Sequence, residues 1–305
     1  MTTSVSRRTV ILSAAPLALP GCAAAAGRES ADAAAPEPAT GGPASPDAAF
    51  SALESRFSAT LGLFALDTGS GTRIEHRADE RFGHASTLKA LAAAAVLDSA
   101  PDLEIPIPVE AEDLVEYSPI LQEQVGSTVT LREVADAAVR YSDNTAGNLL
   151  LAQLGGPAGL EAALRAIGDR TTSVDRWEPE LNEVSPGDVR DTSTPRALAT
   201  SLQAFVLDGV LDADRSELLT EMLTTTTTGD TLIMAGAPDG WEVGSKSGAA
   251  AYGTRNDLGI AWPSGDRAPI VIAVMSHRDA PDAEYDDRLV AEAAEVAFRA
   301  LIEEG

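Results

Sequence analysis

The 305-residue sequence predicts an α+β domain, with an antiparallel five-stranded sheet flanked by terminal helices and an inserted all-α lobe. Three observations predict this fold class. Two strand-like segments come early in the domain, three more come near its end, and the long block between them is mostly helical. Strands drawn from both ends of a domain enclose the intervening segment as a second lobe, so we expect a ligand cleft between the two lobes.

The first 22 residues predict an export signal. Paired Arg7 and Arg8 precede an apolar stretch over residues 10–19 that is too short to span a membrane permanently. This pattern resembles a twin-arginine signal peptide. The sequence Leu-Pro-Gly-Cys that ends at Cys22 resembles a bacterial lipobox, in which the cysteine is lipidated. Cys22 is the only cysteine, which supports that interpretation.

The alternative for this segment is cleavage among the alanines at 23–26, which would release a soluble protein. Residues 23–47 are rich in Ala, Pro and Gly and show no apolar periodicity, so they predict a disordered tether. We therefore expect an exported protein, either secreted or anchored to the outer face of the cell membrane. The lipid anchor would be its one contact with a membrane.

The folded domain is predicted to cover residues 48–305. Residues 49–57 favour a short amphipathic helix, and residues 61–67 and 72–76 favour strands joined by a Gly-containing turn. The Ala- and Leu-rich stretch from Ser86 to Leu97 favours a buried helix. The pattern stays mostly helical to about Met222, so the all-α lobe covers residues 84–222.

Three strands and a helix complete the predicted domain. Alternating or continuous apolar runs predict strands over residues 241–249, 254–262 and 269–277, the last two joined by a turn at Gly265. The closing helix is predicted over residues 286–302, because its apolar residues recur on one face.

Charge and composition exclude several classes of partner and cofactor. Acidic residues outnumber basic ones by 47 to 22, and a net charge of −25 argues against nucleic acid and anionic membrane surfaces as partners. The three histidines show no HxH or HExxH spacing, which argues against a zinc hydrolase. We expect no metal and no organic cofactor. Only two of the basic residues are lysines, Lys89 and Lys246.

Both lysines lie in short motifs that carry chemistry. Ser86 and Lys89 are three residues apart at a helix start, where an amine can help to activate a serine nucleophile. Lys246-Ser247-Gly248 closes a predicted strand, and Ser142-Asp143-Asn144 lies between helical segments. Taken singly, these motifs are also compatible with a helix cap and surface lysine, a strand end, and an N-cap.

The three motifs in this order resemble those of class A β-lactamases and penicillin-binding proteins. The segment Arg176-Trp177-Glu178-Pro179-Glu180-Leu181-Asn182 is similar to the class A omega loop. The resemblance implies that Glu178 and Asn182 hold the water that hydrolyses the acyl-enzyme. It also implies an ion pair between Arg176 and Asp191 at the base of the loop.

The resemblance assigns further residues to substrate binding. It implies that Tyr117 lines the cleft and that Arg255 supports recognition of the substrate carboxylate together with Lys246 and Ser247. Backbone N–H groups of Ser86 and Ala249 would form the oxyanion hole. The resemblance further implies a monomer and a small-molecule β-lactam substrate. The full set of expected binding residues is Tyr117, Asn144, Asn182, Lys246, Ser247, Gly248, Ala249 and Arg255.

The implied reaction is hydrolysis of the β-lactam amide bond through a serine acyl-enzyme, which confers β-lactam resistance. Ser86 attacks, Ser142 passes a proton to the departing nitrogen, and Glu178 activates water for deacylation. The acylating base is either Lys89 or Glu178 acting through water. A D,D-peptidase or penicillin-binding enzyme is the first alternative, and a non-catalytic β-lactam sensor domain is the second.

Overall fold

A computed structural model describes residues 45–304. The predicted signal peptide, the lipobox with Cys22 and the tether up to residue 44 lie outside the described residues. The folded part begins slightly earlier than the predicted Ala48. Helix α1 covers Pro46–Phe57, with Pro46 in its first turn and the Ser45 side chain accepting a hydrogen bond from Ala48 N at 3.4 Å. Serine at the N-cap followed by proline is a favourable helix start, which explains the earlier boundary.

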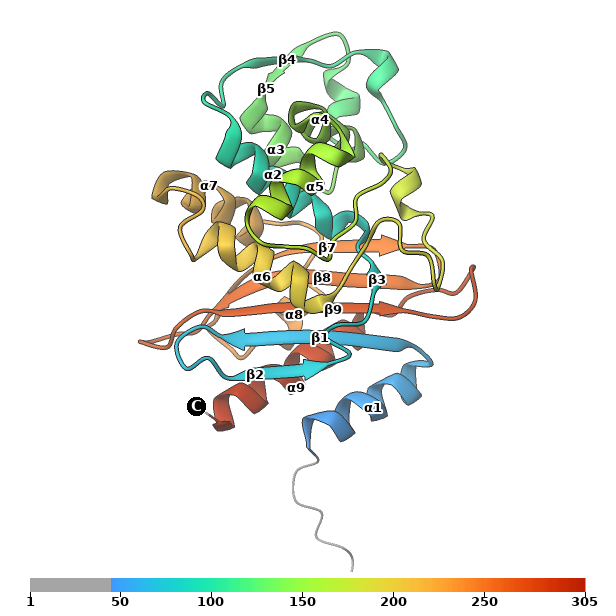
Figure 1. The fold of residues 1–305 in the computed structure, drawn as a ribbon, viewed down its shortest axis with the longest axis vertical. Helices are drawn as coiled ribbons and strands as arrows, with labels where there is room; N and C mark the ends of the chain where they lie inside the picture. Colours follow the sequence, from blue (N-terminus) through green and yellow to red (C-terminus); the bar gives the residue numbers. More distant parts are fainter. Residues whose placement is uncertain (1–44, 305) are drawn as a thin grey trace, which may run out of the picture. The chain divides into compact units, whose positions relative to one another are not determined.

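The central sheet has five strands in the order β2-β1-β9-β8-β7, and each neighbouring pair is antiparallel (Figure 1). The predicted five-stranded sheet built from both ends of the domain is therefore confirmed, and its boundaries agree within one residue. The strands are β1 (Thr60–Asp67), β2 (Arg73–His76), β7 (Glu242–Ala250), β8 (Thr254–Trp262) and β9 (Ile270–His277).

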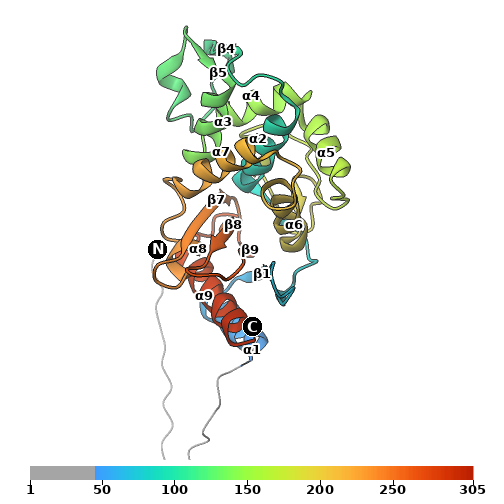
Figure 2. The ribbon, with the colours of Figure 1, turned by 90° about the vertical axis from the view of Figure 1, so that its left-hand side faces the viewer.

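Helices cover both faces of this sheet, which explains why its central strands are apolar almost throughout. Helices α1 and α9 (Asp287–Glu304) pack together on one face, and α6 (Pro195–Val206) packs on the other (Figures 1 and 2). Successive residues of β1 point to opposite faces: Leu63 joins the cluster with α9, whereas Phe64 joins the cluster facing the helical lobe. A strand covered on both faces lacks the usual alternation of polar and apolar residues.

The helical lobe surrounds one apolar helix, α2 (Leu88–Ser99). Every α2 residue from Leu88 to Leu97 is buried, because the helix is enclosed by its neighbours rather than facing solvent on one side. The surrounding helices are α3 (Leu131–Arg140), α4 (Asn144–Leu154), α5 (Pro157–Ala166) and α7 (Ala213–Thr224). Tight turns of 3₁₀ type interrupt the lobe at η2 (Ala111–Asp113) and η3 (Leu121–Gln124).

The expectation that this lobe is entirely helical is wrong in detail. It contains a small two-stranded sheet of β4 (Pro106–Pro108) and β5 (Thr128–Thr130), and a second pairs β3 (Phe82–Gly83) with β6 (Thr192–Ser193). These strands have two or three residues each, too few to produce a recognisable pattern. A four-residue helix, α8 (Ile233–Gly236), was also missed for that reason.

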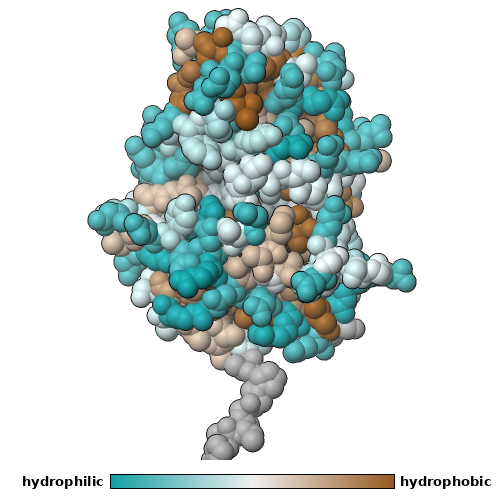
Figure 3. All heavy atoms as spheres, turned by 180° about the vertical axis from the view of Figure 1, so that it is seen from behind, coloured by the Kyte–Doolittle hydropathy of each residue, from teal (hydrophilic) through white to brown (hydrophobic). Residues whose placement is uncertain are grey.

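The surface of the described part is largely polar. The face shown in Figure 3 is mostly hydrophilic or neutral in colour, with apolar atoms most evident at the end formed by the helical lobe. Across residues 45–304, the longest helices are too polar or too short to cross a lipid bilayer.

Candidate active site

A cleft of about 460 Å³ lies where the helical lobe meets the edge strand β7 of the sheet. It contains most of the residues that the sequence motifs single out. The lining residues are Ser86, Tyr117, Ser142, Asn144, Asn182, Thr228, Asp230, Thr231, Ser247, Gly248, Ala249, Arg255 and Tyr285. The three separate motifs therefore converge on one surface, as the sequence analysis expects.

Ser86 lies in a 3₁₀ turn, η1 (Ala85–Thr87), directly before α2. The sequence suggested a continuous helix from Ser86, but the α-helix begins only at Leu88. Ala85 has a φ of 48°, in the left-handed region that L-residues rarely adopt. The Thr87 hydroxyl donates to His84 O at 2.6 Å and holds the turn from within. This tight turn presents the Ser86 hydroxyl to the cleft.

Lys89 sits beneath the floor of the cleft and joins three of the predicted site residues. Its Nζ lies 2.6 Å from Ser86 Oγ, 2.7 Å from Asn144 Oδ1 and 2.5 Å from Glu178 Oε1. The Lys89 and Glu178 side chains are 4% and 1% exposed, so this is a buried ion pair or its neutral equivalent. Buried charges need such partners, and here the partners also connect the nucleophile to the carboxylate.

Glu178 is held by two asparagines. Glu178 N donates to Asn148 Oδ1 at 2.8 Å, and Asn148 Nδ2 donates back to Glu178 O at 2.9 Å. Asn182, in the 3₁₀ turn η4 (Glu180–Asn182), donates from Nδ2 to Glu178 Oε2 at 2.5 Å. The Asn182 Oδ1 atom is buried and accepts no hydrogen bond from residues 45–304. It can therefore accept one from a small ligand beside Glu178.

An ion pair closes the base of the loop that carries Glu178. Arg176 Nε lies 2.6 Å from Asp191 Oδ2, which agrees with the pairing implied by the family resemblance. Asp191 is fully buried and also accepts hydrogen bonds from the backbone N–H groups of Asp175 and Arg176. A carboxylate buried in this way needs such donors, because an unpaired buried charge is costly.

Lys246 lies deeper than the other predicted binding residues. It is fully buried, does not line the cleft, and donates from Nζ to Ser247 O at 2.9 Å. Burial, and then the positive charge of Lys89, hold the pKa of Lys246 well below its usual range. Ser247 does line the cleft, and its hydroxyl donates to Thr228 Oγ1 at 2.8 Å. Lys246 therefore lies behind Ser247, beneath the wall of the cleft.

Gly248 allows β7 to lie directly against the nucleophile turn. A Cβ atom at this position would lie 3.1 Å from Thr87 N and 3.2 Å from both Ala85 Cβ and His84 O. Any side chain there would push the strand away from Ser86. Because β7 is an edge strand, alternate N–H groups along it have no ladder partner on the outer side. Ala249 follows in this strand and lines the cleft.

Tyr117 and Ser142 reach the cleft from loops of the helical lobe, with φ values of 60° and 61°. Residues in this region cost of order 1–3 kcal/mol and persist only where surrounding contacts hold them. Asn144 supplies such contacts: its N donates to Tyr117 O at 2.9 Å, and its Nδ2 donates to Glu116 O at 2.8 Å. Asp143 caps α4 by accepting from Ala146 N, which confirms the N-cap in this motif.

Arg255 extends along the sheet side of the cleft. Its Nε lies 2.7 Å from Asp287 Oδ1, and its guanidinium carbon lies 4.8 Å from the centre of the Tyr285 ring. The sequence analysis missed Asn148, Thr228 and Tyr285. Asn148 could have been found, since it lies one helical turn after Asn144 on α4. Thr228 and Tyr285 come from irregular segments, where spacing carries no information about direction.

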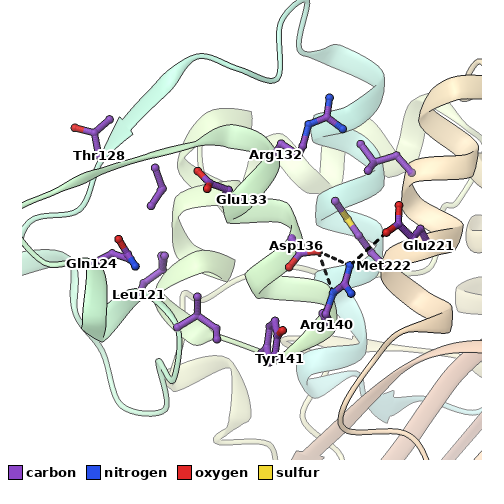
Figure 4. A pocket seen from close by; sticks show the side chains of 13 residues that line it. Leu121, Gln124, Thr128, Arg132, Glu133, Asp136, Arg140, Tyr141, Glu221 and Met222 are labelled. Carbon is purple, nitrogen blue, oxygen red and sulfur yellow. Dashed lines mark hydrogen bonds and ion pairs between the residues drawn. The ribbon is translucent and has the colours of Figure 1, made fainter.

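A second groove, of about 540 Å³, lies on the helical lobe between η3, α3 and α7 (Figure 4). Arg140 crosses it and pairs with Asp136 at 2.7 Å, with Glu221 4.0 Å away. This groove is larger than the cleft but holds none of the predicted site residues. We therefore assign the active site to the cleft, where the sequence motifs converge. Within residues 45–304, no group of three His, Cys, Asp or Glu side chains could hold a metal ion.

Comparisons with known proteins agree with this site. The model of a family described as the β-lactamase enzyme family matches residues 45–301. A β-lactamase from Bacillus amyloliquefaciens is 55% identical over 82% of both chains, and one from Amycolatopsis lactamdurans is 56% identical over 83% of this chain and 84% of its own.

Solved structures give the same result. A halotolerant bacterial β-lactamase superposes with a TM-score of 0.82 at 57% identity, covering 83% of this chain and 98% of that chain. A class A β-lactamase from Clostridium kluyveri also gives a TM-score of 0.82, at 46% identity, covering 84% and 98%. The fold, the motifs and the similarity to these relatives together show that the chain belongs to the β-lactamase enzyme family and is a class A serine β-lactamase.

Proposed function

We propose that this enzyme hydrolyses the β-lactam amide bond through an acyl-enzyme formed on Ser86, using one buried proton relay for acylation and deacylation. The observation that carries this proposal is the position of Lys89 Nζ, which lies within hydrogen-bond distance of both Ser86 Oγ and Glu178 Oε1. Covalent hydrolysis requires a nucleophile, a base to activate it and a base to activate water. Here one chain of hydrogen bonds connects all three groups.

Acylation begins at Ser86. If Lys89 carries the proton in the resting pair, it first gives that proton to Glu178 across 2.5 Å. The neutral amine then accepts the Ser86 proton across 2.6 Å as Oγ attacks the lactam carbonyl. Both steps occur along hydrogen bonds that already exist, so Lys89 is the immediate base and Glu178 the final acceptor. This route needs no intervening water for acylation.

The cleft also provides for the charges on the substrate. We propose that the backbone N–H groups of Ser86 and Ala249 bind the oxyanion, which is supported by the close approach of β7 to η1 at Gly248. The substrate carboxylate would meet the Ser247 hydroxyl and the Arg255 guanidinium on the wall of the cleft. Lys246 would add positive charge from beneath.

The departing lactam nitrogen needs a proton when the C–N bond breaks. We propose that Ser142 supplies it, because its side chain lines the cleft on the helical-lobe side. Ser142 is then reprotonated by Lys89, which recovers its proton from Glu178, so that Glu178 is a carboxylate again before deacylation begins. Deacylation then reuses Glu178. A water held between Glu178 Oε2 and Asn182 Oδ1 loses its proton to Glu178 and attacks the ester carbonyl. As the ester C–O bond breaks, that proton returns through Lys89 to Ser86 Oγ, which regenerates the free serine. The free Asn182 Oδ1 acceptor supports this water position.

The two alternative functions would retain Ser86 and Lys89 but would not need a held carboxylate. A D,D-peptidase or a sensor domain would gain nothing from Glu178 being fixed by Asn148 and Asn182. Hydrolysis of a chromogenic cephalosporin separates these functions. We expect many turnovers per enzyme molecule for the wild type and no acylation for Ser86→Ala. A burst of one product molecule per enzyme, with no further turnover, would overturn the proposed hydrolysis.

We further propose that the enzyme is exported, as a monomer, by a twin-arginine signal and anchored through a lipid on Cys22. Support comes from the paired arginines, the lipobox and the position of the single cysteine. Intact mass spectrometry of the enzyme from its native membrane fraction tests the anchor. An N-terminal diacylglyceryl cysteine is expected, and an unmodified N-terminus among residues 23–26 would contradict it. Light scattering of the purified catalytic domain tests the monomer.

A further inference from the structure

We propose that Tyr285 is a specificity-determining residue, whose ring binds the substituent next to the substrate carboxylate. This inference rests on the proposed binding of β-lactams in the cleft. Tyr285 lies in the loop between β9 and α9, lines the cleft that contains Ser86, and remains 48% exposed. A large aromatic side chain so exposed within a ligand cleft offers a surface for the ligand to cover.

The loop that carries Tyr285 is fixed to the active-site strands. Tyr252 N, in the turn between β7 and β8, donates to Pro281 O at 3.1 Å, and Arg278 N donates to Tyr252 O. Thr231, which also lines the cleft, donates from Oγ1 to Asp287 Oδ2 at 2.5 Å. Tyr285 therefore stands on a braced segment, and its ring can act as a defined wall.

The ring packs against the residue proposed to receive the carboxylate. The Arg255 guanidinium carbon lies 4.8 Å from the ring centre, which is a cation–π distance. Asp287 also holds this guanidinium, with Arg255 Nε 2.7 Å from Asp287 Oδ1. A substrate whose carboxylate reaches Arg255 must place the neighbouring ring atom beside Tyr285.

The chemistry of β-lactams identifies the group that would lie there. In a cephalosporin, the carbon that bears the carboxylate is bonded to C3, and C3 carries a variable substituent. The acylamido group at C7 lies at the other end of the lactam, toward the helical lobe. Tyr117 belongs to that lobe and Tyr285 to the sheet lobe. The two aromatic side chains would thus select different substituents: Tyr117 the acylamido group and Tyr285 the C3 group.

Two cephalosporins with the same C7 side chain test this division. One carries hydrogen at C3, and the other an aryl group bonded through carbon, which cannot depart during the reaction. For Tyr285→Ala we expect KM for the C3-aryl compound to rise about fivefold with kcat unchanged, since the contact exists in both ground and transition states. The C3-hydrogen compound should change less than twofold. Tyr285→Phe should behave as wild type, because it retains the ring.

Tyr117→Ala provides the matched comparison. It should respond to changes of the C7 side chain and not to changes at C3. An equal rise in KM for both C3 compounds in Tyr285→Ala would overturn the proposal, because it would show that the ring only supports Arg255. Absence of wild-type turnover with either compound would instead refute the proposed hydrolysis, so the two failures are distinguishable.

Discussion

The side-chain amide of Asn148, on α4, makes two hydrogen bonds to the backbone of Glu178. Asn148 Oδ1 accepts from Glu178 N at 2.8 Å, and Asn148 Nδ2 donates to Glu178 O at 2.9 Å. The loop that carries Glu178 is thereby fixed to the same helix that begins with Asn144, a partner of Lys89. One helix thus sets the positions of the amine and the carboxylate relative to each other. Small displacements of such groups cost large factors in rate.

Removing these two hydrogen bonds should slow deacylation more than acylation. In Asn148→Ala, both hydrogen bonds to Glu178 are lost while Ser86 and its turn are untouched. We expect the deacylation rate to fall by about tenfold or more, and the acylation rate to fall by a clearly smaller factor, because Lys89, the immediate base for Ser86, is still held by Asn144. Stopped-flow single-turnover kinetics measure both. If the two rates fell in equal proportion, Asn148 would be a general structural residue and not a support for Glu178.

The ion pair at the base of the loop should contribute to stability. Arg176→Met leaves Asp191 fully buried without its cation, and breaking such a pair costs about 3 kcal/mol of unfolding free energy. Arg190→Met is the matched control, because Arg190 pairs with Asp188 at the surface, where ion pairs contribute little. Urea denaturation monitored by circular dichroism compares them. Equal midpoints for the two variants would contradict the assigned role of Arg176.

The buried carboxyl of Asp257 should make stability depend on pH. Burial raises the pKa of Asp257 to about 6, from the 3.8 of a solvent-exposed aspartate. Between these two pH values the folded state retains a proton that the unfolded state releases. The contribution of Asp257 to the free energy of unfolding is therefore fully present below pH 3.8 and is lost as pH rises through 6.

Asp257→Asn should remove this loss of stability at higher pH, because asparagine does not titrate. An asparagine can keep the hydrogen bond from Ile233 N and can pair with the neighbouring buried hydroxyl of Ser245. We expect the variant to be more stable than wild type at pH 7.5, by up to about 3 kcal/mol, and equally stable near pH 4. Thermal unfolding at both pH values provides the comparison. A variant that was less stable at pH 7.5 would show that ionised Asp257 is favourable, through the nearby Lys246.

Sequence reasoning found the sheet, the central apolar helix and most of the site, because these depend on periodicity and on short motifs. It could not find the left-handed conformations of Ala85, Tyr117 and Ser142, since surrounding contacts impose them against local preference. It also could not tell how deeply Lys246 is buried. Whether a lysine lines a cleft or lies beneath it depends on how the two lobes pack, which no local pattern encodes.

The central claim, that Glu178 releases the acyl-enzyme formed on Ser86, is tested most directly with Glu178→Ala. Glu180→Ala, two residues away in the same loop, is its control, because Glu180 lies outside the relay. Intact mass spectrometry after mixing each enzyme with a penicillin reports the covalent state of the protein. We predict that Glu178→Ala accumulates a species heavier by one whole penicillin molecule, while Glu180→Ala and wild type do not. Steady-state turnover by Glu178→Ala at the wild-type rate, with no such species, would contradict the account.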